Sequence, residues 1–268
     1  MNQRTLYITF DGQQIAISSR SPEVLWQVER YFREMLSTEP GIPLAYLEVY
    51  SQNNVFLLLV NGQITAQELP LSNLIYQIKY EVIRHLMEAR SNLLWFHAGA
   101  VALGDTAIMF SGLSGRGKST LVVNLCDRGW NYLSDDILPL NIDTSQFLPF
   151  PQMPKVRENV NQQLSSDCLD ELKQVDIQLK SEIICRKPMS VKAIIFPYYC
   201  YNSPTELLSF SRANAALDLL QNCLNFLEHQ EKALSYVAEL VKSTPTFTLV
   251  FNDGSCATDL IEKMEIVL

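Results

Sequence analysis

Gly112-Leu113-Ser114-Gly115-Arg116-Gly117-Lys118-Ser119 matches the pattern G-x-x-x-x-G-K-[ST]. In this pattern a run of backbone N–H groups cradles phosphate oxygens, and glycines permit the close approach and unusual backbone angles that this requires. The Lys118 ammonium can reach the β- and γ-phosphates, and the Ser119 hydroxyl can ligate Mg²⁺. The sequence therefore predicts a nucleoside triphosphate site, with binding residues Gly112, Ser114, Gly115, Arg116, Gly117, Lys118, Ser119 and Thr120.

The residues on either side of this motif favour the same interpretation. Residues 106–110 form a short apolar run of the kind found in buried strands. Residues 119–126 continue as a helix with an apolar stripe, and Arg128-Gly129 is a typical helix stop. Strand, loop and helix thus follow in the order the motif needs. The helix N-terminus would point its partial positive charge at the phosphates.

The first 90 residues read as a separate, small α+β domain. Strands are expected at residues 6–10, 14–17, 44–50 and 55–60. A helix is expected from Pro22, capped by Ser21, with an apolar face that extends to Leu36. A second, long amphipathic helix is expected over residues 71–89.

Residues 91–268 read as an α/β domain that contains the motif. Further strands are expected at 131–134, 191–197 and 247–251, and helices at 213–227, 231–241 and 259–264. The stretch from about 149 to 188 is irregular, with a helix expected at about 164–173. It is either a lid over the phosphate site or a variable surface excursion.

Composition limits the classes of function. The net charge of −8 argues against a broad nucleic-acid-binding surface. The sequence shows neither an apolar run of membrane-spanning length nor a signal peptide. Six cysteines without a C-x-x-C pair indicate reduced, buried thiols and a cytoplasmic protein. The three histidines are too scattered to indicate a zinc site.

A pair of acids, Asp135-Asp136, comes 17 residues after Lys118, directly after the strand expected at 131–134. A carboxylate at this point is where a phosphate-loop enzyme holds Mg²⁺. A lone acidic pair is often a solvated turn, but apolar residues flank this one, which favours a constrained position in a cleft. Two carboxylates also permit a division of labour, because one can serve the metal while the other accepts a proton.

The span from His97 to Asp136 resembles the catalytic core of HPr kinase/phosphorylase and related serine kinases. The shared pattern comprises His97-Ala98-Gly99-Ala100-Val101, the glycine motif, Arg128-Gly129 and Asp135-Asp136. More loosely, the first 90 residues look like the front domain of HPr-kinase-like proteins found beside peptide-modifying enzymes. The glycine motif also looks like that of ATP-dependent phosphoenolpyruvate carboxykinase, which shares the nucleotide-binding architecture.

The resemblance implies a role for each matching residue. Lys118 would hold the phosphates of ATP, and Ser119 and Asp136 would organise Mg²⁺. Asp135 would act as the general base on a Ser or Thr hydroxyl, and His97 would tune the proton affinity of Asp135. The base and metal roles of the two aspartates could also be exchanged.

Two departures from the family pattern concern the acceptor and the reverse reaction. Thr120 stands where the family has Glu after the loop Ser. The nearest candidate for the family's Glu-x-Arg-Gly signature is Lys155-Val156-Arg157, which lacks the Glu and the Gly. Neither phosphorylase activity nor HPr as the substrate is therefore expected. Two interpretations of these basic residues stay open. Either Lys155 or Arg157 contacts phosphate or an acidic substrate, or the two residues are simply a solvated basic pair.

The sequence thus predicts a P-loop core like that of the HPr kinase C-terminal domain and phosphoenolpyruvate carboxykinase, preceded by a small α+β domain. The expected activity is an ATP- and Mg²⁺-dependent kinase for a Ser or Thr hydroxyl of a peptide or protein, without nucleic acid or membrane. Two alternatives stay open: a nucleotide-switched regulatory protein, and a kinase for free serine or a sugar. A degenerate site that only binds peptide is disfavoured by the intact set of Lys118, Ser119 and Asp135-Asp136. The sequence leaves the oligomeric state open, and a homo-oligomer is one of the alternatives.

Overall fold

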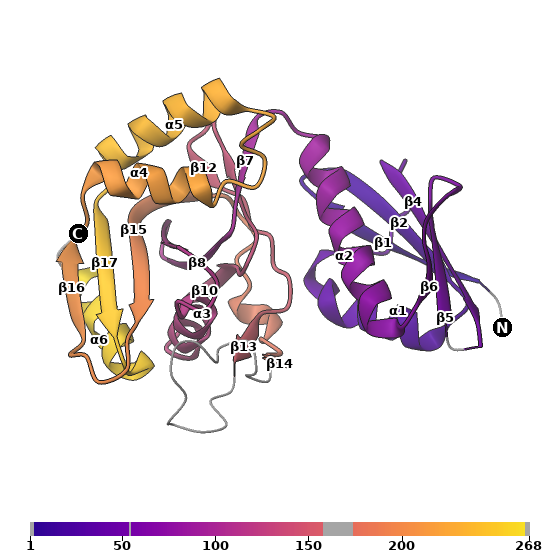
Figure 1. The fold of residues 1–268 in the computed structure, drawn as a ribbon, viewed down its shortest axis with the longest axis horizontal. Coiled ribbons are helices and arrows are strands. Elements are labelled where there is room, and N and C mark those ends of the chain that lie inside the picture. Colours follow the sequence, from indigo (N-terminus) through magenta and orange to yellow (C-terminus); the bar gives the residue numbers. More distant parts are fainter. Residues whose placement is uncertain (1–2, 54, 158–173, 266–268) are drawn as a thin grey trace. The chain divides into compact units, whose positions relative to one another are not determined.

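The computed structural model describes residues 3–53, 55–157 and 174–265. The chain divides into two compact units, Met1–Ser91 and Asn92–Leu268. Both units combine β-sheet with helices, so the protein has a mixed α/β fold (Figure 1).

The first unit is a six-stranded sheet with two helices. The sheet order is β3-β1-β2-β4-β5-β6, and its elements are β1 (Arg4–Phe10), β2 (Gln13–Ser19), α1 (Pro22–Tyr31), β3 (Leu36–Ser37), β4 (Ala45–Gln52), β5 (Val55–Val60), β6 (Gln63–Leu69) and α2 (Leu71–Glu88). The Ser21 hydroxyl accepts a hydrogen bond from the Val24 amide at 3.4 Å, so Ser21 caps α1 as expected.

Helix α1 is shorter than its apolar pattern predicts. It ends at Tyr31, because Phe32 leaves the helical conformation with φ −103° and ψ 20°. A short 3₁₀ turn, η1 (Arg33–Met35), follows, and Leu36 then pairs with Ile8 of β1. Leu36 is therefore part of an edge strand and does not belong to the helical face.

The second unit is built on a nine-stranded sheet. Its main path is β10-β8-β9-β15-β12-β11-β7, and β17 and β16 extend the sheet beyond the carboxyl-terminal half of β15. The strands are β7 (Leu93–Phe96), β8 (Ala98–Leu103), β9 (Thr106–Ser111), β10 (Asn131–Ser134), β11 (Leu138–Asn141), β12 (Gln146–Phe147), β15 (Met189–Tyr199), β16 (Glu206–Ser209) and β17 (Thr246–Phe251). Strands β9, β15 and β17 are parallel, so their carboxyl ends meet at one edge.

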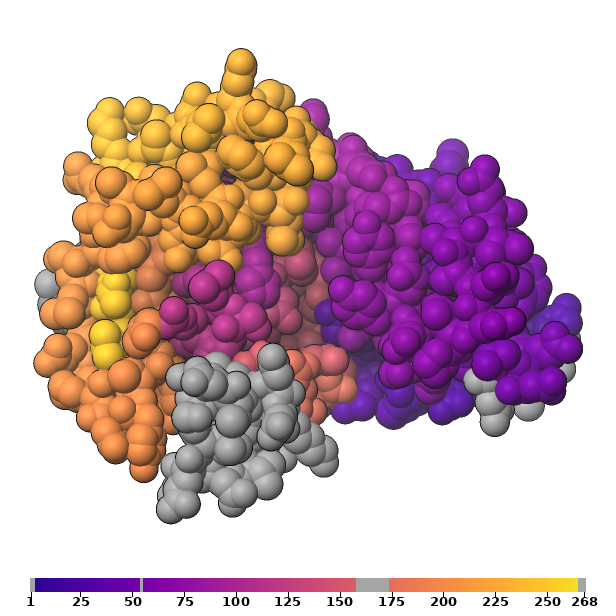
Figure 2. Space-filling view, in the orientation of Figure 1, coloured from indigo at the N-terminus to yellow at the C-terminus, as the bar shows by residue number. Residues whose placement is uncertain are grey.

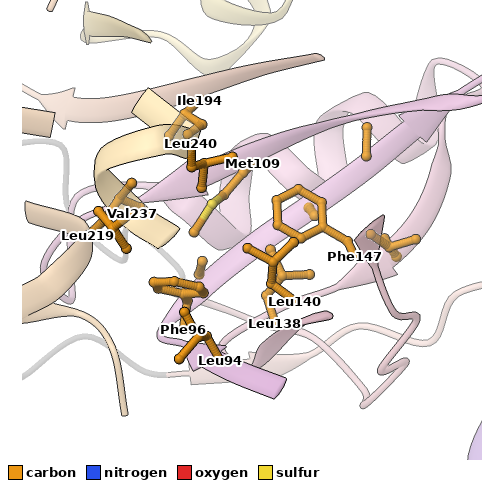
Figure 3. Close-up of a cluster of buried hydrophobic side chains, with 14 of the residues drawn as sticks. Leu94, Phe96, Met109, Leu138, Leu140, Phe147, Ile194, Leu219, Val237 and Leu240 are labelled. Atoms are coloured by element: carbon orange, nitrogen blue, oxygen red, sulfur yellow. The ribbon is translucent and has the colours of Figure 1, made fainter. Parts of the chain in front are cut away.

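Two hydrophobic clusters cover this sheet. One cluster joins it to α4 (Arg212–Gln221) and α5 (Gln230–Ser243), through residues such as Leu219 and Val237 (Figure 3). The other joins it to α3 (Lys118–Asp127) and α6 (Gly254–Glu265). Because β15 contributes Ile194 to the first cluster and Ile195 to the second, the two clusters lie on opposite faces. The sheet is thus covered on both faces, and the carboxyl ends of its parallel strands meet at one edge.

Helix α4 ends six residues before the predicted helix boundary at Leu227. It stops at Gln221, and the Asn222 side chain bonds back to the Asp218 carbonyl at 2.8 Å. The next residues turn away because the Leu224 amide donates to the Trp95 carbonyl at 2.7 Å. A tertiary contact with β7 therefore overrides the apolar pattern.

The segment 149–188 contains a small two-stranded sheet, in which β13 (Lys155–Arg157) pairs with β14 (Gln174–Asp176), and a 3₁₀ turn, η3 (Ser181–Ile183). The helix predicted at about 164–173 lies outside the described residues.

Two further observations concern the whole described chain. None of its helices combines the length and the apolar character that crossing a membrane would need. Among its cysteines, Cys126, Cys185 and Cys223 are buried free thiols, whereas Cys256 is a free thiol at the surface. Cys256 thus departs from the expectation of buried thiols, because it lies in the first turn of α6.

Candidate active site

The site begins at the glycine loop, residues 112–117, which joins β9 to α3. Gly112, Gly115 and Gly117 have φ angles of 133°, 83° and 96°, which L side chains rarely adopt. A Cβ atom at Gly117 would also lie 2.6 Å from the Phe251 ring at the end of β17. Glycine at 117 is thus required both by the backbone and by the neighbouring strand.

Lys118, the first residue of α3, points its ammonium back into the glycine loop. Its side chain is buried, and Nζ donates to the Gly112 carbonyl at 2.6 Å and to the Leu113 carbonyl at 3.1 Å. Burial lowers the pKa of Lys118, and the nearby charges of Asp136 and Asp135 oppose that effect. The ammonium is therefore fixed at the mouth of the loop, where a phosphate would need it.

His97 lies between Lys118 and the acid pair. Its Nε2 is 3.2 Å from Lys118 Nζ, and its Nδ1 is 3.1 Å from the Asp136 carbonyl. Since a carbonyl can only accept, Nδ1 carries the proton and Nε2 accepts from the ammonium. Burial, and then the charge of Lys118, lower the pKa of His97, which agrees with a neutral ring.

These contacts place His97 against Lys118 and the Asp136 backbone. The groups that shift the pKa of Asp135 most do not include His97. The tuning of Asp135 by His97, which the family resemblance implies, therefore stays a prediction.

The acid pair follows β10 at the same edge of the sheet as the glycine loop. Strand β8 pairs antiparallel with both β9 and β10, so β9 and β10 run in the same direction. Asp135 is buried, and Gly99 on β8 leaves room for Val122 of α3 and, less tightly, for Asp135, because a Cβ atom there would lie 2.8 Å from Val122 Cγ2 and 3.3 Å from Asp135 Oδ1. Asp136 is half-buried with a φ of 67°, and the Ile137 amide donates across it to the Asp135 carbonyl at 2.9 Å. This tight turn is a locally strained conformation of the kind that clusters at functional sites.

The Asp135 carboxyl group is buried, and neither oxygen makes a hydrogen bond of good geometry, although the Ser119 hydroxyl and the Lys155 backbone are close enough to lower its pKa. Burial, and then the negative charge of Asp136, raise the pKa of Asp135 from 3.8 to about 7. The nearby Ser119 hydroxyl and Lys118 ammonium lower this pKa only in part. A buried acid that ionises near neutral pH, next to a second carboxylate, is typical of functional sites and suits a general base.

The oxygen ligands in this region suit Mg²⁺, which keeps water and substrate phosphates as ligands, better than a metal ion that is bound by protein side chains alone. In the part of the chain that the structure describes, no three or more His, Cys, Asp or Glu side chains gather into a metal site. The Asp136 carboxylate and the Ser119 hydroxyl, both close to the buried Asp135 carboxyl group, offer oxygen ligands. Mg²⁺ prefers one or two carboxylates together with water and substrate phosphates, so these residues fit it.

A third carboxylate, Asp218 of α4, also reaches this edge. Its Oδ1 accepts from the Ser111 hydroxyl at 3.1 Å and from Asn222 Nδ2 at 3.0 Å. The Asn222 carbonyl in turn accepts from the His97 amide at 2.8 Å. Burial raises the pKa of Asp218, and its bonds to Ser111 and Asn222 oppose that shift. Helix α4 therefore holds in place the residue before the glycine loop and the backbone of His97.

Sequence reasoning missed Asp218 and Asn222, which appeared only as members of an amphipathic helix. They lie about a hundred residues from the loop in sequence, so no local pattern links them to it. Only the packing of α4 on the sheet brings them close.

The remaining predicted residues lie around the loop. Arg157 on β13 donates to the Ser114 hydroxyl at 3.3 Å, whereas Lys155 pairs with Asp176 at 3.8 Å. Of this basic pair, Arg157 therefore reaches the loop through its side chain. The Cζ atom of Arg116 lies 4.0 Å from the centre of the Tyr198 ring. Thr120, in the first turn of α3, is half-buried against the start of α6, since a Cβ atom at Gly254 would lie 3.6 Å from its Cγ2.

Comparison with known proteins adds a distant structural likeness. No family model matches the sequence, and no curated protein has a significantly similar sequence. The structure is similar to an Hpr(Ser) kinase/phosphatase from Coxiella burnetii. The TM-score is 0.32 and the sequence identity 14%, over 64% of this chain and 92% of the other. At that TM-score the likeness carries no weight for the chemistry, which rests on the residues of this chain.

Proposed function

We propose that the protein is an ATP- and Mg²⁺-dependent kinase of the P-loop class that phosphorylates a Ser or Thr hydroxyl of a peptide or protein. The observation that carries the proposal is the buried carboxyl group of Asp135, which lacks a hydrogen bond of good geometry and whose pKa is raised to about 7 beside the glycine loop. Residues 91–268 would form the kinase domain and residues 1–90 a small α+β domain, in a cytoplasmic protein.

Each residue near the loop has a role in this reaction. The loop amides and the Lys118 ammonium would hold the β- and γ-phosphates of ATP, because amides at a helix N-terminus and a fixed positive charge both favour anions. Ser119 and Asp136 would hold Mg²⁺, which neutralises phosphate charge when it is bound. His97, neutral and bonded to Lys118, would keep the ammonium aimed at the phosphates.

Asp135 would take the proton of the acceptor hydroxyl. The hydroxyl oxygen forms a bond to the γ-phosphorus, and the bond from that phosphorus to the bridging oxygen breaks to leave ADP. The proton passes to the Asp135 carboxylate, which must be ionised beforehand. A pKa near 7 provides a substantial ionised fraction at neutral pH and a carboxylate more basic than ordinary aspartate.

The proposal is tested with γ-labelled ATP and Mg²⁺, offered in parallel to a Ser/Thr peptide library, to free serine, to sugars and to no acceptor. We expect label on peptides, with the modified hydroxyl identified by mass spectrometry. Label on a small molecule would make the protein a small-molecule kinase. Phosphate release without any labelled acceptor would indicate a nucleotide-switched protein and would overturn the proposal.

A further inference from the structure

The strand order fixes the direction in which a bound nucleotide would extend, if the function proposed above holds. Strands β10 and β8 lie on one side of β9, with the acid pair at the end of β10, and β15 and β17 lie on the other side. The γ-phosphate would lie by Lys118 and the acids. The nucleoside must therefore leave the loop on the side of β15 and β17, whose carboxyl ends meet the loop at the same edge.

The elements on that side are packed against the loop and its helix. Phe251, the last residue of β17, is buried, and its ring fills the space where a side chain at Gly117 would lie. The start of α6 is equally close, because a Cβ atom at Gly254 would lie 2.5 Å from Asn124 Nδ2 of α3. The end of β17 and the start of α6 are therefore closely packed against the glycine loop and α3.

One arginine–tyrosine contact lies on this side of the loop. The Arg116 guanidinium, from the loop itself, lies over the ring of Tyr198 near the end of β15, 4.0 Å from the ring centre. Tyr198 is 44% exposed and Arg116 is half-buried. The Asp218 carboxylate interacts with the charge of Arg116. In Figure 2 the magenta part of the chain, which includes the glycine loop, reaches the surface beside the orange part, which includes β15 and α4.

We propose that the base of the nucleotide stacks on the pair formed by Arg116 and Tyr198. A guanidinium that lies over an aromatic ring offers a π-like face and a positive charge, and both attract the electron-rich face of a nucleobase. No other arginine–tyrosine stack is found in the residues that the structure describes. The pair would thus bind the base of the nucleotide, whereas the phosphates bind the glycine loop and Lys118.

The test compares the binding of two probes, MgATP and inorganic tripolyphosphate with Mg²⁺, by isothermal titration calorimetry. Both probes fill the glycine loop, but only ATP carries a base. The variants are Tyr198→Leu, which keeps bulk without a ring, and Tyr198→Phe, which keeps the ring. We expect Tyr198→Leu to weaken MgATP about tenfold, the effect of losing one base–aromatic stack, and to leave tripolyphosphate binding unchanged. Tyr198→Phe should bind both probes as the wild type does.

The outcomes separate this inference from the function it rests on. Unchanged ATP affinity in Tyr198→Leu, or an equal loss for both probes, overturns the stacking while the phosphate site stands. Tight tripolyphosphate binding by a wild type that does not bind ATP also overturns it. A wild type that binds neither probe overturns the proposed function itself, and the stacking with it.

Discussion

Replacing Asp135 with asparagine should stabilise the second unit at neutral and alkaline pH while it removes the proposed base. Asp135 is 2% exposed and its carboxyl group makes no hydrogen bond of good geometry, so burial opposes its ionisation in the folded protein. Asparagine has nearly the same shape and no charge to bury. The pH-dependent part of the stability gained would measure the free-energy cost of ionising this buried carboxyl group.

The pKa sets the size and the pH range of the effect. A pKa raised from 3.8 to about 7 makes ionisation about 4 kcal/mol less favourable in the folded protein, at roughly 1.36 kcal/mol per tenfold change in the acid constant. The folded pKa lies above the unfolded value, so between pH 3.8 and about 7 the folded state keeps a proton that the unfolded chain has lost. The contribution of Asp135 to the free energy of unfolding of the wild type therefore falls as the pH rises through that interval, and it is constant at higher pH. An unpartnered asparagine amide opposes the gain by about 1–3 kcal/mol.

The assay is urea unfolding of wild type and Asp135→Asn at pH 5, 6, 7 and 8, without nucleotide or metal. Tryptophan fluorescence reports mainly on the second unit, because Trp95 and Trp130 are buried there while Trp26 of the first unit is exposed. The difference in free energy of unfolding should grow by about 2–3 kcal/mol in favour of the variant between pH 5 and 7 and then stay constant. Asp127→Asn, at an exposed position at the end of α3, is the control and should stay within about 0.5 kcal/mol of wild type. A difference for Asp135→Asn that is the same at all four pH values would refute the reasoning.

Three further predictions follow from the same geometry. Gly117→Ala forces a side chain into a φ of 96° and against the Phe251 ring, so the free energy of unfolding should fall by about 2–4 kcal/mol, and an unchanged urea midpoint would speak against the described loop. Lys118→Ala removes the ammonium at the loop mouth and should weaken MgATP by about tenfold to a hundredfold in a fluorescent-nucleotide titration; affinity within twofold of wild type would contradict its role. The rate of phosphoryl transfer should rise between pH 5 and about 7 and then level off as Asp135 ionises, and a rate that falls over this range would be incompatible with a base at 135.

Local patterns in the sequence were sufficient for the parts of the fold that they alone determine. The apolar run before the loop is β9, the stripe after it is α3, and the acid pair directly follows β10, as expected. Ser21 caps α1 because a hydroxyl before a helix has an amide three residues ahead to bind. In each case the residues that set the structure lie within a few positions of one another.

Long-range packing decided the features that the sequence did not reveal. The end of α4 depends on the bond from the Leu224 amide to Trp95, and the role of Asp218 depends on its contact with Ser111. The contact of Arg116 with Tyr198 joins segments eighty residues apart. None of these pairs leaves a periodic signal, because each depends on how helices and strands pack on the finished sheet.

The most direct test of the central claim measures ATP binding and acceptor phosphorylation in the same samples of wild type and Asp135→Asn. Because Lys118 and the loop amides hold the phosphates without the base, the variant should bind MgATP about as tightly as wild type and yet transfer no detectable phosphate to peptide. Phosphoryl transfer by Asp135→Asn at the wild-type rate would contradict the account.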